Sequence, residues 1–335
     1  MIDVAIASDW NYLPHAGTLI RSLCDNNRNN DLRIHLLTMD SRVVDDELLG
    51  RFFGSIVSDR VSAKVHFVDA NNPFITRIPK DGAITNKSAY LRFLASDLIE
   101  ADKVLYLDSD IVVLDDLGSL FETELSGRML AAVTDIFVCP SSWNYSLSLR
   151  YFNSGVLLIN AKKWREENWF DRTLRFMCDK FVPMRMGLRH YGDQDILNMT
   201  MAGKVVYVHP RYNMVNPFFL RRSFFRGKIF DEASLKPAII HFAGGAKPWN
   251  QWDFHPMSEC YYFYRKRTPW TEFAVQKPTI RAVRRYAAFL LKYYCPYLIY
   301  PFSELAQILK GLPSRCINSE QIEWLMQETS QNQIR

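Results

Sequence analysis

The stretch KVLYLDSDIVVLDD (103–116) decides the fold class and locates the candidate site. Its residues 104–107 form an apolar run that is typical of a strand buried within a parallel sheet. The run ends on two aspartates one residue apart, Asp108 and Asp110. Because residues i and i+2 of an extended chain point to the same side, we expect the two carboxylates to lie together.

Two neighbouring carboxylates repel each other, and a divalent cation held between them removes that repulsion. Oxygen ligands with open coordination positions suit Mg²⁺ or Mn²⁺, and either ion can bridge to the phosphates of a ligand. A solvated acidic turn after a strand is the simpler alternative. Phosphatases of the haloacid-dehalogenase type also end a buried strand on Asp-x-Asp, where the first aspartate is a nucleophile. Their motif usually follows the first strand, whereas this one lies further along the chain.

Around this strand, the chain alternates between strand-like and helix-like segments. Short apolar or β-branched runs predict strands at 2–7, 33–37, 64–68, 104–107 and 155–160. Helices are expected at 17–23, 44–53, 88–98 and 164–180. This alternation predicts an α/β fold with a mostly parallel sheet covered on both faces. Ligands of such sheets bind beyond the carboxyl ends of the strands, so Asp9, Asp108 and Asp110 should share one rim.

The composition is that of a folded protein from a reducing compartment. Of the 335 residues, 48% are hydrophobic and 23% are charged, which excludes an intrinsically disordered chain. The six cysteines show no Cys-x-x-Cys spacing, which argues against a structural zinc site or a disulfide framework. The N-terminal residues MIDVAIASDW predict a strand and lack the features of a signal peptide. We therefore expect a cytoplasmic location.

Four further motifs accompany the aspartate pair, namely IASDWNY (6–12), YFNSGVLLIN (151–160), YGDQDILN (191–198) and HFAGGAKPW (241–249). In this order and spacing, over roughly residues 2–255, the set resembles the family 8 retaining glycosyltransferases. It is most similar to the bacterial enzymes that add galactose or glucose to the lipopolysaccharide core, and glycogenin is a more distant relative. The resemblance implies one Rossmann-like, nucleotide-sugar-binding domain of the GT-A type over 1–255 and a UDP-hexose donor.

The resemblance also implies roles for individual residues. The metal, Mn²⁺ or Mg²⁺, would be held by Asp108, Asp110 and His241, and the imidazole favours Mn²⁺. The expected nucleotide-binding residues are Ala7, Asp9, Asn11, Arg92, Gly244 and Lys247. The expected sugar-binding residues are Asp135, Asn153, Asp193 and Gln194. Lys247, Gln194 and Asp193 are the candidate catalytic residues, with Lys247 stabilising the departing diphosphate.

Retention of configuration by double displacement requires a carboxylate close to the anomeric carbon. The matching residue here is Gln194, whose amide is a poor nucleophile. We therefore prefer front-face attack by the acceptor hydroxyl, with the departing phosphate as base. Asp193 and Asp195 flank the amide, so a carboxylate nucleophile stays open.

A basic, aromatic region follows residue 255. Residues 261–300 carry eight Lys or Arg and one acid, a net charge of +7. Because the whole chain has a net charge of +5, the remaining residues have a net charge of −2. At 100° per residue, Arg281, Arg284, Arg285 and Lys292 fall on one arc of a helix. Such a helix suits an anionic bilayer, although Pro296 leaves it too short to span one. We expect 256–335 to be helical and peripheral on the inner membrane's cytoplasmic face; a packed helix with solvated arginines is the alternative.

The leading hypothesis is a metal-dependent, retaining hexosyltransferase that moves galactose or glucose from a UDP-sugar to a lipid-linked lipopolysaccharide or lipooligosaccharide core acceptor. The aromatic and basic stretch NPFFLRRSFFRGK (216–228) is expected on the acceptor side, and no nucleic-acid partner is expected. The alternatives are a glycogenin-like transferase acting on protein or glycan, the phosphatase, and a non-catalytic binding protein. The complete Asp, Asp and His set argues against the last.

Overall fold

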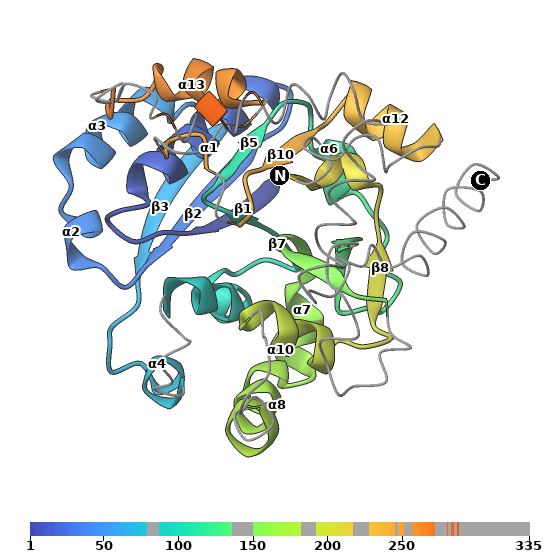
Figure 1. The fold of residues 1–335 in the computed structure, drawn as a ribbon. Helices are drawn as coiled ribbons and strands as arrows, with labels where there is room; N and C mark the ends of the chain where they lie inside the picture. The colour runs from blue at the N-terminus through green and yellow to red at the C-terminus, as the bar shows by residue number, and fades with distance from the viewer. Residues whose placement is uncertain are drawn as a thin grey trace.

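The structure is a computed structural model that describes residues 1–78, 87–135, 150–181, 192–216, 228–244, 247–250, 255 and 257–271, and positions 280, 283, 284 and 287. At its centre lies a seven-stranded sheet with strand order β3-β2-β1-β4-β7-β6-β8 (Figure 1). The strands are β1 (Ile2–Ala7), β2 (Leu32–Thr38), β3 (Val61–Phe67), β4 (Lys103–Asp108), β6 (Leu130–Thr134), β7 (Phe152–Asn160) and β8 (Val205–Tyr207).

The predicted mostly parallel sheet is confirmed. Strands β3, β2, β1 and β4 pair in parallel, as do β6 and β8, and only β7 runs antiparallel to its neighbours β4 and β6. The chain moves outward from β1 to β2 and β3 and then returns to β4 on the other side of β1. The reversal creates a crevice between the carboxyl ends of β1 and β4, where such sheets bind ligands.

Helices cover both faces of the sheet (Figure 1). One hydrophobic core joins the sheet to α1 (Leu13–Asn26) and α3 (Glu47–Ile56), and α2 (Ser41–Val44) precedes α3. The opposite core is formed with α4 (Pro73–Arg77), α5 (Ala95–Leu98), α7 (Ala161–Glu166), α8 (Trp169–Phe176) and α10 (Asp193–Thr200). The remaining helical segments are α6 (Gly118–Phe121), η4 (Pro210–Tyr212) and α12 (Lys228–Leu235).

Two predicted helices have a different form. Residues 88–98 consist of a 3₁₀ helix, η1 (Lys87–Leu94), followed by the short α5. The predicted helix 164–180 is interrupted at Asn168, whose φ of 51° lies in the left-handed region, so that α7 ends and α8 starts. A π-helical turn, η3 (Met177–Phe181), follows α8. Asparagine tolerates this φ better than most residues, and the apolar periodicity does not reveal such a break.

A second, three-stranded sheet was not predicted. It has the order β5-β10-β9 and contains β5 (Ile111–Val113), β10 (Ile239–His241) and β9 (Met214–Val215). Strand β10 runs antiparallel to β5, with His241 opposite Ile111, and Phe242 N–H donates to Asp110 O at 2.9 Å. This register brings a residue from position 241 beside the aspartate pair.

The C-terminal region begins with α13 (Ser258–Arg265), which packs on α1. The Tyr261 hydroxyl lies 2.6 Å from His15 Nδ1, and the Trp270 ring lies where a Cβ on Gly17 would approach it to 2.4 Å. The first part of the region, 257–271, therefore contacts the domain predicted for 1–255. Arg281, Arg285, Lys292 and residues 217–227 lie outside the described residues, so the amphipathic helix and the acceptor-side stretch remain predictions.

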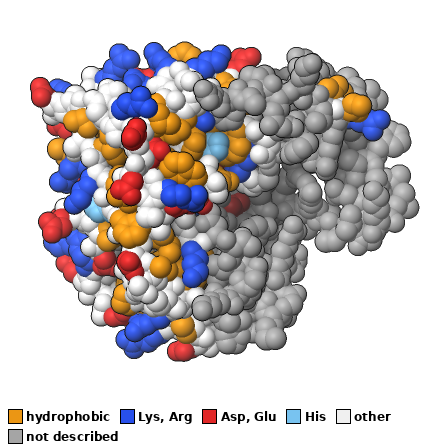
Figure 2. Space-filling view, turned by 90° about the vertical axis from the view of Figure 1, so that its left-hand side faces the viewer, with side chains coloured by type: hydrophobic (Ala, Val, Ile, Leu, Met, Phe, Trp, Pro, Cys, Tyr) orange, Lys and Arg blue, Asp and Glu red, His pale blue; other side chains and the backbone are white. Residues whose placement is uncertain are grey.

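No helix within the described ranges has both the length and the apolar character that crossing a bilayer requires. On the α2 and α3 side of the molecule, basic and acidic side chains are interspersed, with hydrophobic side chains in small groups between them (Figure 2). Exposed hydrophobic residues of these and neighbouring elements include Val44, Val57 and Phe67.

Candidate active site

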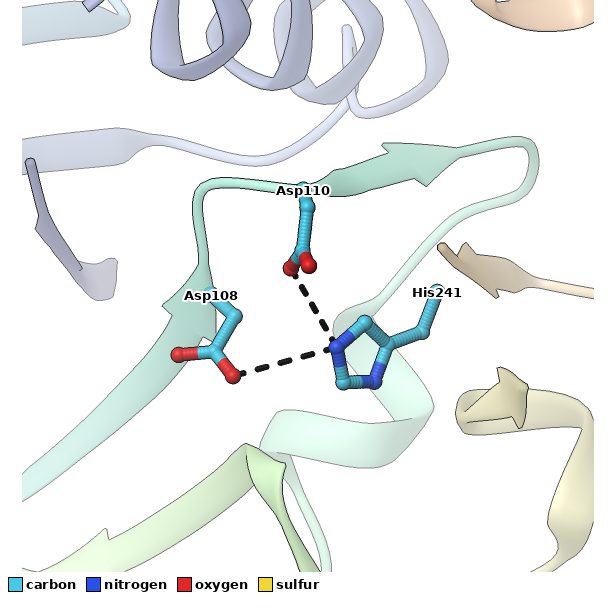
Figure 3. A group of neighbouring side chains, drawn as sticks. All are labelled: Asp108, Asp110 and His241. Carbon is cyan, nitrogen blue, oxygen red and sulfur yellow. Dashed lines mark ion pairs between the residues drawn. The ribbon is translucent and has the colours of Figure 1, made fainter. Parts of the chain in front are cut away.

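Three side chains meet at the carboxyl end of β4 (Figure 3). Asp108 is the last residue of β4, Asp110 lies in the turn before β5, and His241 ends β10. His241 Nε2 is 3.2 Å from Asp110 Oδ1 and 3.8 Å from Asp108 Oδ2, and one ligand atom from each residue lies within 4.8 Å of the others. Two carboxylates and an imidazole fit a small divalent cation, and the imidazole favours Mn²⁺ over Mg²⁺.

The two carboxylates meet for a different reason from the one expected. The strand ends at Asp108, and Ser109 and Asp110 form a turn, so an extended i, i+2 geometry is not what aligns them. Instead, the chain passes from the large sheet to the small one between these aspartates, and both carboxylates face His241 (Figure 3). The next acidic pair is structural: Asp115 pairs with Arg211, and Asp116 accepts the Gly118 N–H at the start of α6.

Gly155 gives the metal ligands the space that they occupy. A Cβ on this residue of β7 would lie 2.2 Å from His241 Cε1 and 2.8 Å from Asp108 Oδ2. Such a Cβ would displace two of the three ligands. Sequence reasoning placed Gly155 in a strand but did not see this approach, because it depends on where β7 and β10 lie relative to each other.

Replacing Gly155 with alanine should therefore weaken Mn²⁺ binding at least about tenfold, the effect typical of disturbing the support of metal ligands. Isothermal titration with Mn²⁺ in the presence of UDP measures this change. Gly54→Ala is the matched control, because no atom of the described part of the chain lies within 4 Å of the added Cβ in α3 and alanine favours a helix. Wild-type Mn²⁺ affinity in the Gly155 variant would contradict the role given to this glycine.

Lys247 reaches the aspartate pair from the segment after β10. Its ammonium forms an ion pair with Asp110 Oδ2 and donates to Phe242 O at 2.7 Å. Burial acts to raise the pKa of Asp110, but the charges of Lys247 and His241 outweigh it and hold this pKa well below the usual range. Trp249 anchors the segment by stacking on His15, with 3.7 Å between ring centroids. Asp110 is therefore a carboxylate at neutral pH.

Arg92 is 4% exposed and connects the metal ligands to the neighbouring polar residues. Its guanidinium donates to Asp108 Oδ1 at 2.8 Å and to Ser154 O at 2.6 Å, and its Nε lies 3.2 Å from Asp193 Oδ2. The guanidinium also lies over the ring of Tyr106, whose hydroxyl donates to Asp108 Oδ1 at 2.9 Å. These bonds orient the Asp108 carboxylate.

A cavity of about 170 Å³ extends from the metal ligands to the end of β1. Its lining includes five of the residues predicted for metal or nucleotide, which are Ala7, Asp9, Arg92, Asp108 and Asp110. Tyr12 also lines it and was not predicted; its N–H donates to Asp9 Oδ1 at 3.0 Å. Asn11 is exposed in the turn before α1 and is not among the lining residues.

The predicted sugar-binding residues also come together, from β7, α10 and the end of β6. Asn153 Nδ2 and Gln194 Nε2 both donate to Asp135 Oδ2, at 3.2 and 3.1 Å. Ser154 N–H donates to Gln194 Oε1 at 3.0 Å, so both ends of the Gln194 amide are engaged. Gly244 has a φ of 81°, a conformation that glycine adopts without strain.

The two aspartates beside Gln194 differ in their surroundings. Asp195 is fully buried and accepts the Tyr151 hydroxyl. Asp193 accepts the Ser154 hydroxyl at 3.3 Å and pairs with Arg92. Burial raises the pKa of Asp193, with a smaller increase from Asp108, while Arg92 opposes the shift.

The mixed sheet, with its cavity at the carboxyl ends of β1 and β4 and its acidic pair at the same edge, has the fold of the GT-A type. The family to which the protein belongs follows from the sequence. The chain belongs to glycosyl transferase family 8, whose profile matches residues 3–253. Membership confirms the resemblance drawn from the motifs and sets the phosphatase alternative aside.

Individual relatives show how much of the chain is shared. The glycosyltransferase GlyF of Streptococcus pneumoniae is 29% identical over 84% of this chain, which matches 65% of the length of GlyF. The lipopolysaccharide 1,2-glucosyltransferase of Escherichia coli K12 is 25% identical, over 88% of this chain and 86% of that enzyme. The solved structure of galactosyltransferase LgtC with donor and acceptor sugar analogues superposes with a TM-score of 0.66. The superposition covers 80% of this chain and 96% of LgtC, and the two sequences are 24% identical. The two proteins therefore share a fold.

Proposed function

We propose that this protein transfers galactose or glucose, with retention, from a UDP-hexose to a lipid-linked oligosaccharide of the lipopolysaccharide core. The observation that carries the proposal is the meeting of Asp108, Asp110, His241 and Lys247 at one end of a cavity whose other end is lined by Ala7 and Asp9. Relatives named as a lipopolysaccharide 1,2-glucosyltransferase and a 1,3-galactosyltransferase, at 25% and 26% identity, support the acceptor class.

The residues at the cavity suggest which part of the UDP-hexose donor each of them would bind. Ala7 leaves space for a flat base, Tyr12 offers an aromatic face, and Asp9 offers hydrogen-bond acceptors for uracil or ribose. A divalent cation held by Asp108, Asp110 and His241 would supply positive charge to the diphosphate. Lys247 has a third N–H beyond its bonds to Asp110 and Phe242 O, and this donor can stabilise the departing phosphate.

The polar network around Asp135 favours front-face attack. The Gln194 amide is held at both ends, by Ser154 N–H and by Asp135, and its oxygen is a poor nucleophile. Asp195 is buried against Tyr151, and Asp193 is engaged by Arg92 and Ser154, so neither carboxylate is free to attack. In this proposal the acceptor hydroxyl attacks from the side that the phosphate leaves, and the phosphate takes its proton.

Gln194→Ala should remain active, with kcat lowered no more than about tenfold for the loss of one sugar-orienting amide. Initial rates measure the loss, and intact-protein mass spectrometry of a quenched reaction searches for a glycosyl-enzyme. Wild-type enzyme treated identically is the control. An isolated covalent adduct in either protein would refute the front-face proposal.

The decisive test of the function is incubation with a panel of UDP-sugars and Mn²⁺, scoring UDP release with and without a chelator. Release from UDP-galactose or UDP-glucose that depends on a core oligosaccharide and stops with the chelator is the expected result. Transfer only to protein or glycan acceptors would instead favour a glycogenin-like enzyme. Release that the chelator leaves unchanged would contradict the role given to the metal.

The C-terminal region supports a position at the cytoplasmic face of the inner membrane, where a lipid-linked acceptor would be met. Residues 261–300 carry eight basic residues and one acid, and anionic lipids attract such segments. The protein should float with anionic vesicles and not with neutral ones. Substituting Arg281, Arg284 and Arg285 by glutamate should abolish flotation, and flotation that survives would contradict the role of this region.

A further inference from the structure

A chain of buried and half-buried side chains leads from the metal ligands to the sugar-binding residues. His241 Nδ1 lies 2.9 Å from Asn213 Oδ1, and Asn213 Nδ2 donates to Asn153 Oδ1 at 2.9 Å. Asn153 Nδ2 donates in turn to Asp135 Oδ2 at 3.2 Å, the oxygen that also accepts from Gln194. Asn213 is 1% exposed, and it lies between η4 and β9, outside the motifs that the sequence analysis used.

The carboxylate at the end of this chain determines the direction of each bond. A carboxylate only accepts, so Asn153 turns its NH₂ group toward Asp135 and its oxygen toward Asn213. The backbone N–H of Gly155 donates to that same oxygen at 3.0 Å, which supports this orientation. Asn213 must then direct its NH₂ group to Asn153 and its oxygen to His241.

The orientation of Asn213 decides which nitrogen of His241 carries the proton. An amide oxygen only accepts, so the proton lies on Nδ1. In the neutral imidazole, the form that binds a metal, the lone pair is then on Nε2, the nitrogen that faces Asp108 and Asp110 (Figure 3). A histidine can bind a metal only through a nitrogen with a lone pair, and the bond made by the other nitrogen sets which one that is.

We propose that Asn213 is a positioning residue that holds His241 in its metal-binding tautomer, and that Asp135 in the sugar pocket sets this tautomer through Asn153 and Asn213. The inference deepens the proposed function, on which it rests, because it states how the metal and sugar sites of one enzyme are connected. It also gives Asp135 a second role besides contact with the hexose.

Two substitutions of Asn213 separate its two bonds. Asn213→Leu keeps the approximate size and removes both, so Mn²⁺ binding should weaken about 10- to 100-fold. Asn213→Asp keeps an acceptor for the His241 Nδ1–H but loses the donor to Asn153. It should retain Mn²⁺ coordination by histidine and raise the KM for the UDP-hexose.

Pulsed EPR of the full-length protein with Mn²⁺ and UDP detects histidine nitrogen coordinated to the metal, independently of activity. We expect the nitrogen coupling in wild type and in Asn213→Asp, and its loss in Asn213→Leu. Asn27→Leu is the matched control, since Asn27 is also 1% exposed and its amide also bonds at both ends, to Leu23 O and Leu117 N–H. It should lower the thermal stability and leave the coupling and the Mn²⁺ affinity unchanged.

Wild-type coupling and Mn²⁺ affinity in Asn213→Leu would overturn the proposal, as would loss of the coupling in a folded Asn213→Asp protein. If Asn213→Leu does not fold, the Asn213→Asp result decides alone. The proposed function fails separately: a wild-type protein that shows the nitrogen coupling but transfers no hexose contradicts the function and leaves the role of Asn213 standing.

Discussion

Asp110→Asn should lower kcat at least about 1,000-fold, which corresponds to about 4 kcal/mol of lost transition-state stabilisation. The substitution keeps the size of the side chain but removes one anionic ligand from the Asp108, Asp110 and His241 set. It also leaves the ammonium of Lys247, 9% exposed, without its ion-pair partner. Steady-state kinetics with UDP-hexose, and titration with Mn²⁺ in the presence of UDP, measure the two consequences.

The control for this substitution is Asp115→Asn. Asp115 is also an ion-paired aspartate, bound to Arg211, but it lies five residues further along and does not belong to the metal set. We expect activity close to wild type and a small loss of stability.

Because nearby charges hold the pKa of Asp110 below its usual range, the carboxylate form persists down through mildly acidic pH. The difference between Asp110→Asn and wild type should therefore not change between about pH 6 and 8. Unchanged kcat in Asp110→Asn would contradict the proposed role of the metal in the reaction.

Lys247→Met should lower kcat about 100- to 1,000-fold, the loss typical of removing one donor that stabilises developing charge. The methionine keeps much of the apolar stem and removes the ammonium that contacts Asp110 and Phe242 O. Mn²⁺ affinity should not fall, because Asp110 then loses a competing cation and keeps its carboxylate for the metal. This combination distinguishes a leaving-group role from a metal-binding role.

Lys236→Met provides the matched control, since the Lys236 side chain is 80% exposed and, among the described residues, pairs only with Asp115 at 3.8 Å. Its kinetics should match wild type. If Lys247→Met instead raises the KM for the donor at constant kcat, Lys247 binds substrate and transition state equally, and the leaving-group role is wrong.

Local patterns were sufficient for the main elements, whereas most of the candidate site residues came from the resemblance to family 8. Strand β1 was predicted with its observed bounds, and β2, β4 and β7 within a few residues, since apolar runs of this length need a buried sheet. The helices at 88–98 and 164–180 were predicted with the wrong form, because a 3₁₀ segment and a left-handed Asn168 leave no trace in hydrophobic periodicity.

By itself, the sequence determined the fold class, the family motifs and the candidate metal ligands Asp108, Asp110 and His241. These are properties of short segments, because burial and ligand chemistry are decided residue by residue. Only the tertiary structure decided that β10 pairs with β5 beside Asp110, that β7 passes the metal ligands at Gly155, and that Asn213 orients His241. Those contacts join positions far apart along the chain, and they depend on strand register and sheet packing, which no local pattern encodes.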